Sequence, residues 1–212
     1  MHLLAERGRL ALDDPVAAHW PEFGQRGKQG ITIRHVLQHR GGLPVARGMP
    51  LDALVMTEWA ASVRAIERTA PAYPPGDVPA YHILTFGFIL GEVVQRVTGL
   101  PVGDLLRDEL LYPLGLDGEV HLGPPPEAWD RHVPVGDRGP AELVTRLVVT
   151  GATRQAVIPA ASVSATAAGL AGLYQALLDV GHGALLDVGH GALLDVGHGA
   201  LLDVGHGALL DV

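Results

Sequence analysis

The C-terminal end of this 212-residue sequence is a tandem repeat, which limits how much of the chain can fold. From Ala176 the octapeptide ALLDVGHG occurs four times, and a partial copy, ALLDV, reaches Val212. The Gly-His-Gly of each copy interrupts a helix, because glycine costs about 1 kcal/mol relative to alanine in a helix interior. The few apolar residues of each copy cannot, when buried, offset the loss of chain entropy, which is about 1–2 kcal/mol per ordered residue. We therefore expect residues 1–178 to form a partial domain and residues 179–212 to be a disordered tail.

The repeat has two interpretations. It is either a metal-binding tract, since histidines alternate with aspartates, or a tandem expansion of coding sequence without a selected role. The identity of the copies favours the expansion. The alternating residues are His182, His190, His198 and His206 with Asp179, Asp187, Asp195 and Asp203.

Composition indicates one globular domain. The chain is 48% hydrophobic and 18% charged, in the range of one domain that can bury a core. Its 15 basic and 23 acidic residues give a net charge of −8, which lacks the basic surface that nucleic acid binding requires. The absence of cysteine excludes disulfides, thiolate metal sites and a cysteine nucleophile.

The first residues, MHLLAERGRLALDD, lack the pattern of a signal peptide, and no apolar run approaches the roughly 20 residues of a membrane span. The sequence therefore predicts no membrane partner and a cytoplasmic location by default. A longer N-terminal segment could have carried a signal that this sequence does not show.

Apolar periodicity predicts a mainly α domain with a few short strands. The segment TFGFILGEVVQRVTG has the i, i+3, i+4, i+7 spacing of a buried helix face and ends at Gly99. The best strand candidates are GEVHLG and LVVTG. Other helices are expected after Asp14 and Pro15, after Thr32 as N-cap, after Thr57 as N-cap, from Pro101 to Pro113, and after Ser164 or Thr166 as N-cap.

Two histidines four residues apart, His35 and His39, share one face of the predicted helix after Thr32. A zinc-protease helix would carry glutamate directly after the first histidine, and Val36 stands there instead. We interpret the pair as structural, and we expect neither a metal nor another cofactor.

Serine chemistry has three candidates, Ser62, Ser162 and Ser164. None lies in a Gly-x-Ser-x-Gly elbow, and the residue three positions after each is alanine, so no serine is paired with a helix-neighbour lysine. Lys28 is the chain's one lysine.

Tyr81 lies between a Pro-Gly turn and the helix that starts near Phe86. The positive end of that helix dipole favours a phenolate by about 0.3–1 kcal/mol, which suits a general base. The alternative is an aromatic packed at a helix entry with its hydroxyl bonded to backbone.

Five separated blocks, in order, resemble the β-lactamase-related serine hydrolases, the group that includes class C β-lactamases, penicillin-binding peptidases and esterases. The resemblance implies hydrolysis of a small-molecule ester or amide through a serine acyl-enzyme, with Tyr81 in proton transfer and His82, Ser162 and Ser164 as substrate-binding residues. Tyr81-His82-Ile83 departs from the family's Tyr-x-Asn in the manner of its esterase-like branch. The blocks are LLAERGRLALDDPVAAHWPEF, ITIRHVLQHRGGLP, YPPGDVPAYHILTFGFILGEVVQRVTG, LLYPLGL and IPAASVSATAAGLAGLYQALL.

The family's other two motifs have no match. Its Ser-x-x-Lys would precede Met1, and its Lys-Thr-Gly motif would follow the point where the repeats begin. The resemblance thus implies a truncated member: the helical part of a β-lactamase/transpeptidase-like α+β fold, with most of the antiparallel sheet missing. We expect an inactive fragment that exposes apolar surface and is prone to self-association. The alternative is a non-catalytic binding module or pseudoenzyme.

Overall fold

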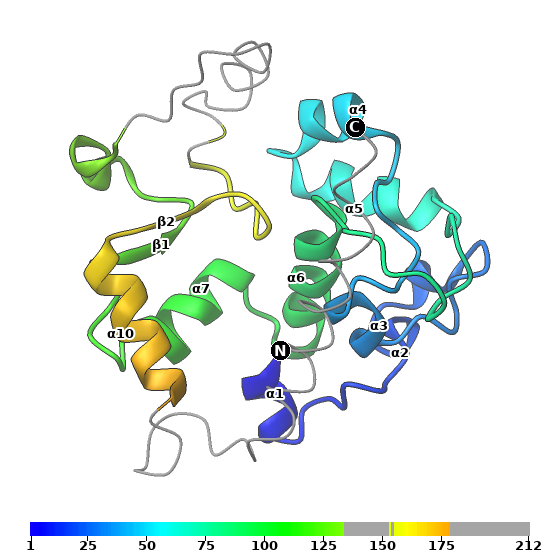
Figure 1. Cartoon of the computed structure of the whole chain (residues 1–212), viewed down its shortest axis with the longest axis horizontal. Helices are drawn as coiled ribbons and strands as arrows, with labels where there is room; N and C mark the ends of the chain where they lie inside the picture. Colours follow the sequence, from blue (N-terminus) through cyan, green and yellow to red (C-terminus); the bar gives the residue numbers. More distant parts are fainter. Residues whose placement is uncertain (134–152, 154, 179–212) are drawn as a thin grey trace.

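The computed structural model describes residues 1–133, 153 and 155–178. Helices form one group around α6, and a strand pair with two helices lies beside that group (Figure 1). The elements are α1 (His2–Glu6), α2 (Val16–His19), η1 (Pro21–Gly24), α3 (Ile33–Leu37), α4 (Met49–Val55), α5 (Trp59–Arg68), α6 (Thr85–Thr98), α7 (Val102–Leu106), η2 (Arg107–Leu111), β1 (Val120–Leu122), η3 (Pro126–Arg131), β2 (Val163–Ala165) and α10 (Ala167–Leu178).

The helix predicted from TFGFILGEVVQRVTG is confirmed as α6, which packs against α2, α3, α5 and α7. Its apolar face is buried, and Phe88, Ile89 and Val93 are among its least exposed residues. Gly99 ends the helix with a φ of 75°, a left-handed conformation that glycine adopts without a side-chain clash.

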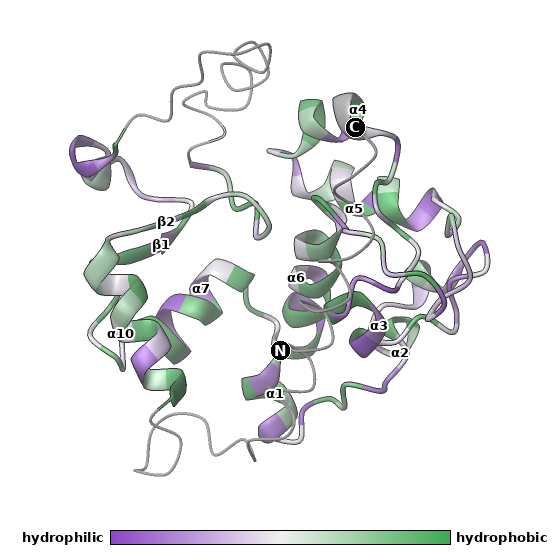
Figure 2. Cartoon of the chain, in the orientation of Figure 1, coloured by the Kyte–Doolittle hydropathy of each residue, from purple (hydrophilic) through white to green (hydrophobic). Residues whose placement is uncertain are grey.

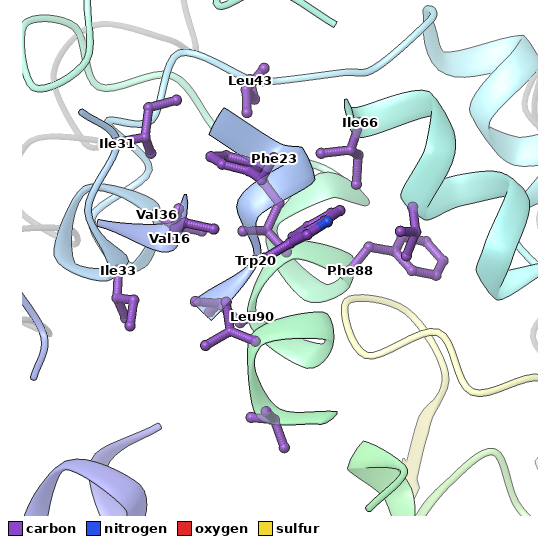
Figure 3. Packing of buried hydrophobic residues seen from close by; sticks show 14 of the residues in the cluster. Val16, Trp20, Phe23, Ile31, Ile33, Val36, Leu43, Ile66, Phe88 and Leu90 are labelled. Atoms are coloured by element: carbon purple, nitrogen blue, oxygen red, sulfur yellow. The ribbon is translucent and has the colours of Figure 1, made fainter. Parts of the chain in front are cut away.

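The hydrophobic core gathers side chains from α2, η1, α3, α5 and α6 (Figure 3). At its centre the rings of Trp20 and Phe23 lie 5.2 Å apart, and both residues are fully buried. The Trp20 indole nitrogen donates a 3.0 Å hydrogen bond to the Glu67 carboxylate, so its polar atom is satisfied inside the core. This core holds α6, and with it the chain that leads into α6, in a fixed position.

Most predicted helix starts are confirmed, and one predicted cap is wrong. Thr32 caps α3: its hydroxyl accepts from the His35 backbone nitrogen at 3.1 Å. Thr166 caps α10, since its hydroxyl accepts from the Gly169 nitrogen at 2.9 Å. The helix expected after Thr57 begins later, at Trp59, and its N-cap Glu58 makes no side-chain capping hydrogen bond. The helix predicted after Thr57 is therefore present, but Thr57 does not cap it.

The described residues contain one antiparallel strand pair, β1 and β2. Val120 lies opposite Ala165, and His121 lies opposite Ser164. The strand expected in GEVHLG is confirmed as β1. The sequence does not predict the strand β2, because the block around it has the pattern of a loop before a helix. The other predicted strand, LVVTG, lies outside the described residues.

Most residues of α10 have colours on the hydrophobic side of the scale in Figure 2, and several of its apolar side chains are exposed. Tyr174 is 64% exposed and Leu178 is 74% exposed, while the buried residue of this helix is Gly169. The self-association expected from exposed apolar surface stays a prediction.

No helix in the described part of the chain is both long and apolar enough to cross a bilayer.

At Gly87, helix α6 packs closely against the segment that precedes β2. A Cβ at this position would lie 2.5 Å from the Ala160 backbone nitrogen and 3.0 Å from the Pro159 carbonyl carbon. We expect Gly87→Ala to destabilise the chain by about 1–2 kcal/mol, because the overpacking exceeds the gain in helix propensity. Urea unfolding followed by circular dichroism measures the change.

Gly103 in α7 is the matched control for that substitution. Its Cβ would meet nothing closer than the Val157 Cγ2 at 3.7 Å, an ordinary van der Waals contact. Gly103→Ala is therefore expected to leave stability unchanged or raise it by up to about 1 kcal/mol. A Gly87→Ala chain as stable as Gly103→Ala would show that the 158–161 segment does not pack on α6.

Candidate active site

Tyr81 stands on the segment that enters α6, four residues before the helix begins at Thr85. Its side chain is 59% exposed. Its ring centroid lies 4.8 Å from that of His39, a residue of the loop that follows α3. Within the described residues no group hydrogen-bonds the Tyr81 hydroxyl. The phenol is thus held from one side and open to solvent on the other, an arrangement suited to a group that exchanges a proton with a ligand.

His82 fixes the backbone beneath Tyr81. Its side chain is fully buried, its Nδ1 donates to the Ala80 carbonyl at 2.7 Å, and its Nε2 accepts from the Leu43 nitrogen at 3.1 Å. These two bonds assign the neutral imidazole with its proton on Nδ1. Burial lowers the pKa of His82 to about 4, with the neighbouring His39 adding to the effect. His82 is therefore a neutral structural link between the α3–α4 loop and the entry to α6, and a role for it in substrate binding stays a prediction.

His39 completes the cluster around Tyr81. Its carbonyl accepts from the Ala80 nitrogen at 2.9 Å, and its Nδ1 accepts from the His82 backbone nitrogen at 3.1 Å. Its ring also stacks on Phe86 at 4.8 Å. The residue has a φ of 57°, in the left-handed region that side chains rarely adopt, and burial lowers the pKa of its imidazole. His39, Tyr81, His82 and Phe86 form what we call the tyrosine cluster.

The pair His35 and His39 does not act as one unit. His35 Nδ1 accepts from the Thr32 backbone nitrogen at 3.3 Å, which completes a capping box with the Thr32 hydroxyl. His39 instead serves the tyrosine cluster. In the residues that the structure describes, no three histidine or acidic side chains gather where they could hold a metal ion. Both histidines have structural hydrogen bonds, as the sequence suggested.

Ser162, expected at the substrate cleft, lies in a turn. Its hydroxyl accepts from the Ile158 nitrogen at 2.8 Å and donates to the Ile158 carbonyl at 3.1 Å. This double contact holds the 158–162 turn that packs on α6 at Gly87. A role for Ser162 in substrate binding stays a prediction.

Ser164 on β2 has a partner that sequence reasoning missed. Its hydroxyl oxygen lies 2.7 Å from Nε2 of His132, which follows η3. Both line a pocket of about 290 Å³ that also contains Arg131 and Glu119. The two residues are 32 positions apart, and no motif spacing links them; the strand pairing and η3 bring them together. No hydrogen bond or ring contact in the described part of the chain joins Tyr81 to Ser162 or Ser164.

Lys28, the one lysine, is not available to activate a serine. Its ammonium is fully buried and donates to the Glu67 carbonyl at 2.8 Å and to the Thr69 carbonyl at 2.5 Å. These are orphan carbonyls at the C-terminal end of α5, which a cation stabilises. Burial lowers the pKa of Lys28 to about 8. The lysine therefore belongs to the core, away from the tyrosine cluster.

Comparison with protein families gives one match over most of the chain. The family model described as Beta-lactamase matches residues 1–199. Among curated proteins, the esterase/beta-lactamase LipL of Mycobacterium tuberculosis is 41% identical over 132 residues, which cover 59% of this chain and 28% of LipL. A putative D-alanyl-D-alanine carboxypeptidase of Escherichia coli K12 is 30% identical over 127 residues, which cover 55% of this chain and 29% of that protein.

Solved structures similar to this chain also include an esterase and a penicillin-binding protein homologue. A family VIII carboxylesterase superposes with a TM-score of 0.76 at 26% identity, covering 87% of this chain and 54% of that one. A penicillin-binding protein homologue from Caulobacter crescentus gives a TM-score of 0.71 at 32% identity, with the same coverage. The chain thus spans less than a third of the two curated relatives and about half of the two solved chains.

Proposed function

Because the chain belongs to the Beta-lactamase family, whose model matches residues 1–199, we propose that it carries the tyrosine side of a serine hydrolase site for small esters or amides. The observation that supports this best is the tyrosine cluster, in which a buried neutral histidine fixes the backbone and leaves the Tyr81 phenol exposed. The esterase and peptidase names of the relatives agree with these substrate classes.

In the proposed reaction, Tyr81 accepts the proton of a serine hydroxyl while the serine oxygen attacks the substrate carbonyl carbon. The bond between the carbonyl carbon and the leaving oxygen or nitrogen then breaks, and Tyr81 returns the proton to the leaving group. Water then attacks the acyl carbonyl carbon while its proton passes to Tyr81, the bond to the serine oxygen breaks, and Tyr81 returns the proton to that oxygen as the acid leaves. Tyr81 is neither consumed nor oxidised, so the step needs no cofactor.

Residues around Tyr81 have supporting roles in this proposal. His82 holds the tyrosine backbone at the substrate cleft. Ser162 maintains the turn against α6, and Ser164 with His132 presents a hydroxyl in the 290 Å³ pocket for substrate contact. None of the three is assigned as the nucleophile.

The 212 residues contain no Ser-x-x-Lys sequence, so we propose that this polypeptide by itself is inactive. A positioned base contributes about 10²–10⁴-fold only when it has a nucleophile to activate. Purified chain is expected to hydrolyse neither p-nitrophenyl butyrate nor a chromogenic β-lactam above background. A fluorophosphonate probe should leave it unlabelled, and stoichiometric labelling of Ser164 would contradict the assignment of that residue.

A graft tests the proposal itself. The matching 132-residue segment of LipL is replaced by its counterpart from this chain, so that the relative supplies every residue outside the match. We expect the graft to hydrolyse p-nitrophenyl butyrate, because the tyrosine cluster would then face a complete site. Circular dichroism and thermal melting establish that the graft is folded.

A shorter graft guards against misfolding of the first one. Only residues 74–99 of this chain, which contain Tyr81 and α6, replace the corresponding block of the relative. If a folded graft of either length lacks activity that the relative itself retains, the proposed role of the tyrosine cluster is wrong.

A non-catalytic binding module is the second candidate function. The absence of Ser-x-x-Lys from the 212 residues favours it, since the pocket at Ser164 and the tyrosine cluster can contact a ligand without a nucleophile. Inactive folded grafts together with saturable binding of an ester or amide by the 212-residue chain would favour this alternative.

A further inference from the structure

A cavity of about 550 Å³ lies between α5 and the loop that precedes α4, outside the tyrosine cluster. Three arginines line it: Arg64 and Arg68 from α5, and Arg47 from the loop. Small side chains form much of the remaining wall, including those of Ala46 and Ala61. The cavity thus combines open space with three cationic groups.

Arg64 and Arg68 have no acidic partner in the part of the chain that the structure describes. They stand four residues apart on α5, and both are exposed. Several other arginines of this acidic protein do pair with carboxylates, as Arg34 does with Asp13 at 2.7 Å and Arg131 with Glu119 at 3.1 Å. Like charges at this helical spacing repel each other. Two guanidinium groups of α5 therefore lie on one helix face without a carboxylate partner among the described residues.

Hydrogen bonds and one ion pair hold the loop that forms one rim of the cavity. The buried Asp52 carboxylate accepts from the Ala46 and Arg47 backbone nitrogens at 2.8 and 3.1 Å, and it pairs with the Arg47 guanidinium at 3.4 Å. The Thr69 hydroxyl is 2.8 Å from the Ala46 carbonyl. The Asp52 carboxylate is not among the residues that line the cavity, and its partners among the described residues all belong to the loop. The loop that carries Arg47 is therefore held against the C-terminal end of α5.

We propose that this cavity is a binding site for a small phosphate group. A guanidinium stays charged at all physiological pH values and presents parallel N–H donors that match the oxygens of a phosphate. Arg64 and Arg68 supply two such forks from one helix face, and Arg47 lines the opposite rim with its guanidinium already bonded to Asp52 and to the Leu51 carbonyl. The ligand is either free inorganic phosphate or the phosphate of a small monoester, and this site is independent of the proposed hydrolase function.

Isothermal titration of the purified 212-residue chain in a chloride buffer tests the site. One arm uses inorganic phosphate and the other uses phenyl phosphate, which distinguishes the free ion from a monoester. We expect saturable binding of at least one of them with one site per chain. The double substitution R64A/R68A is expected to weaken it at least about tenfold, because two charged hydrogen-bond donors are lost.

Two further variants make the result specific. R107A removes the same charge from an exposed arginine outside the cavity, and it is expected to bind as the unmodified chain does. R64K/R68K retains the charge but not the planar fork, and weaker binding than in the unmodified chain would support bidentate recognition. No saturable binding at millimolar phosphate, or equal binding by R64A/R68A and the unmodified chain, would overturn the proposal. Matching thermal melts establish that each variant is folded.

Discussion

In the folded graft, Tyr81→Phe is expected to lower kcat for p-nitrophenyl butyrate by about 10²–10⁴-fold, the contribution of a positioned general base. The substitution removes only the phenol oxygen. The ring contact with His39 at 4.8 Å can persist, because it does not involve that oxygen. Loss of activity would therefore report on proton transfer. The measurement is steady-state hydrolysis of the graft and its variant under the same conditions.

Tyr112→Phe, made in a longer graft that includes residue 112, is the matched control for this prediction. Tyr112 is an exposed tyrosine at the end of η2, 71% accessible, and the same single oxygen is removed. Its variant is expected to keep the kcat of the unmodified graft. A Tyr81→Phe graft that is folded and as active as the Tyr112→Phe graft would show that Tyr81 does not transfer the proton.

Local rules explain why several helices were predictable from sequence. The helix α6 combines an apolar stripe with a glycine stop at Gly99, and both signals lie within one short segment. The Thr32 cap is equally local, since its partner His35 is three residues away. Tyr81 was singled out for the same reason, because the Pro-Gly turn and the helix start flank it directly.

Features built by distant residues were not predictable in this way. The contact of Ser164 with His132 depends on β2 pairing with β1, and neither residue carries a local signal of the other. The cavity at Arg47 needs a loop to fold back onto α5. The hydrogen bonds of Lys28 to the end of α5 likewise connect positions about 40 residues apart, so a sequence scan sees only an isolated lysine. Local periodicity therefore predicted elements, and tertiary pairing decided which side chains meet.

Acid should destabilise the fold of this chain through His82. Its Nε2 accepts a hydrogen bond from the Leu43 nitrogen in a fully buried position, so a proton added there would face another donor. Burial lowers the folded-state pKa from 6.5 to about 4. The unfolded chain therefore binds more protons between these values. Stability is fully present above pH 6.5 and falls as the pH drops toward 4.

The expected loss is roughly 3 kcal/mol between pH 6.5 and 4, since each pKa unit corresponds to about 1.4 kcal/mol. That is a large share of the roughly 5–15 kcal/mol that stabilises a typical domain. Burial lowers the pKa of the neighbouring His39 as well, so its contribution has the same sign. Urea unfolding at a series of pH values from 7 to 4, followed by circular dichroism, measures the slope.

His82→Gln separates this group from the other histidines. The glutamine amide oxygen can accept from the Leu43 nitrogen but does not titrate, so the variant is expected to lose stability at pH 7 and to show a flatter decline below pH 6.5. His121→Gln, on β1 and outside the tyrosine cluster, should keep the decline of the unmodified chain. An equally steep decline in the His82→Gln chain would assign the acid sensitivity to other groups, and the buried neutral imidazole beneath Tyr81 would then not be what holds this entry to α6 together.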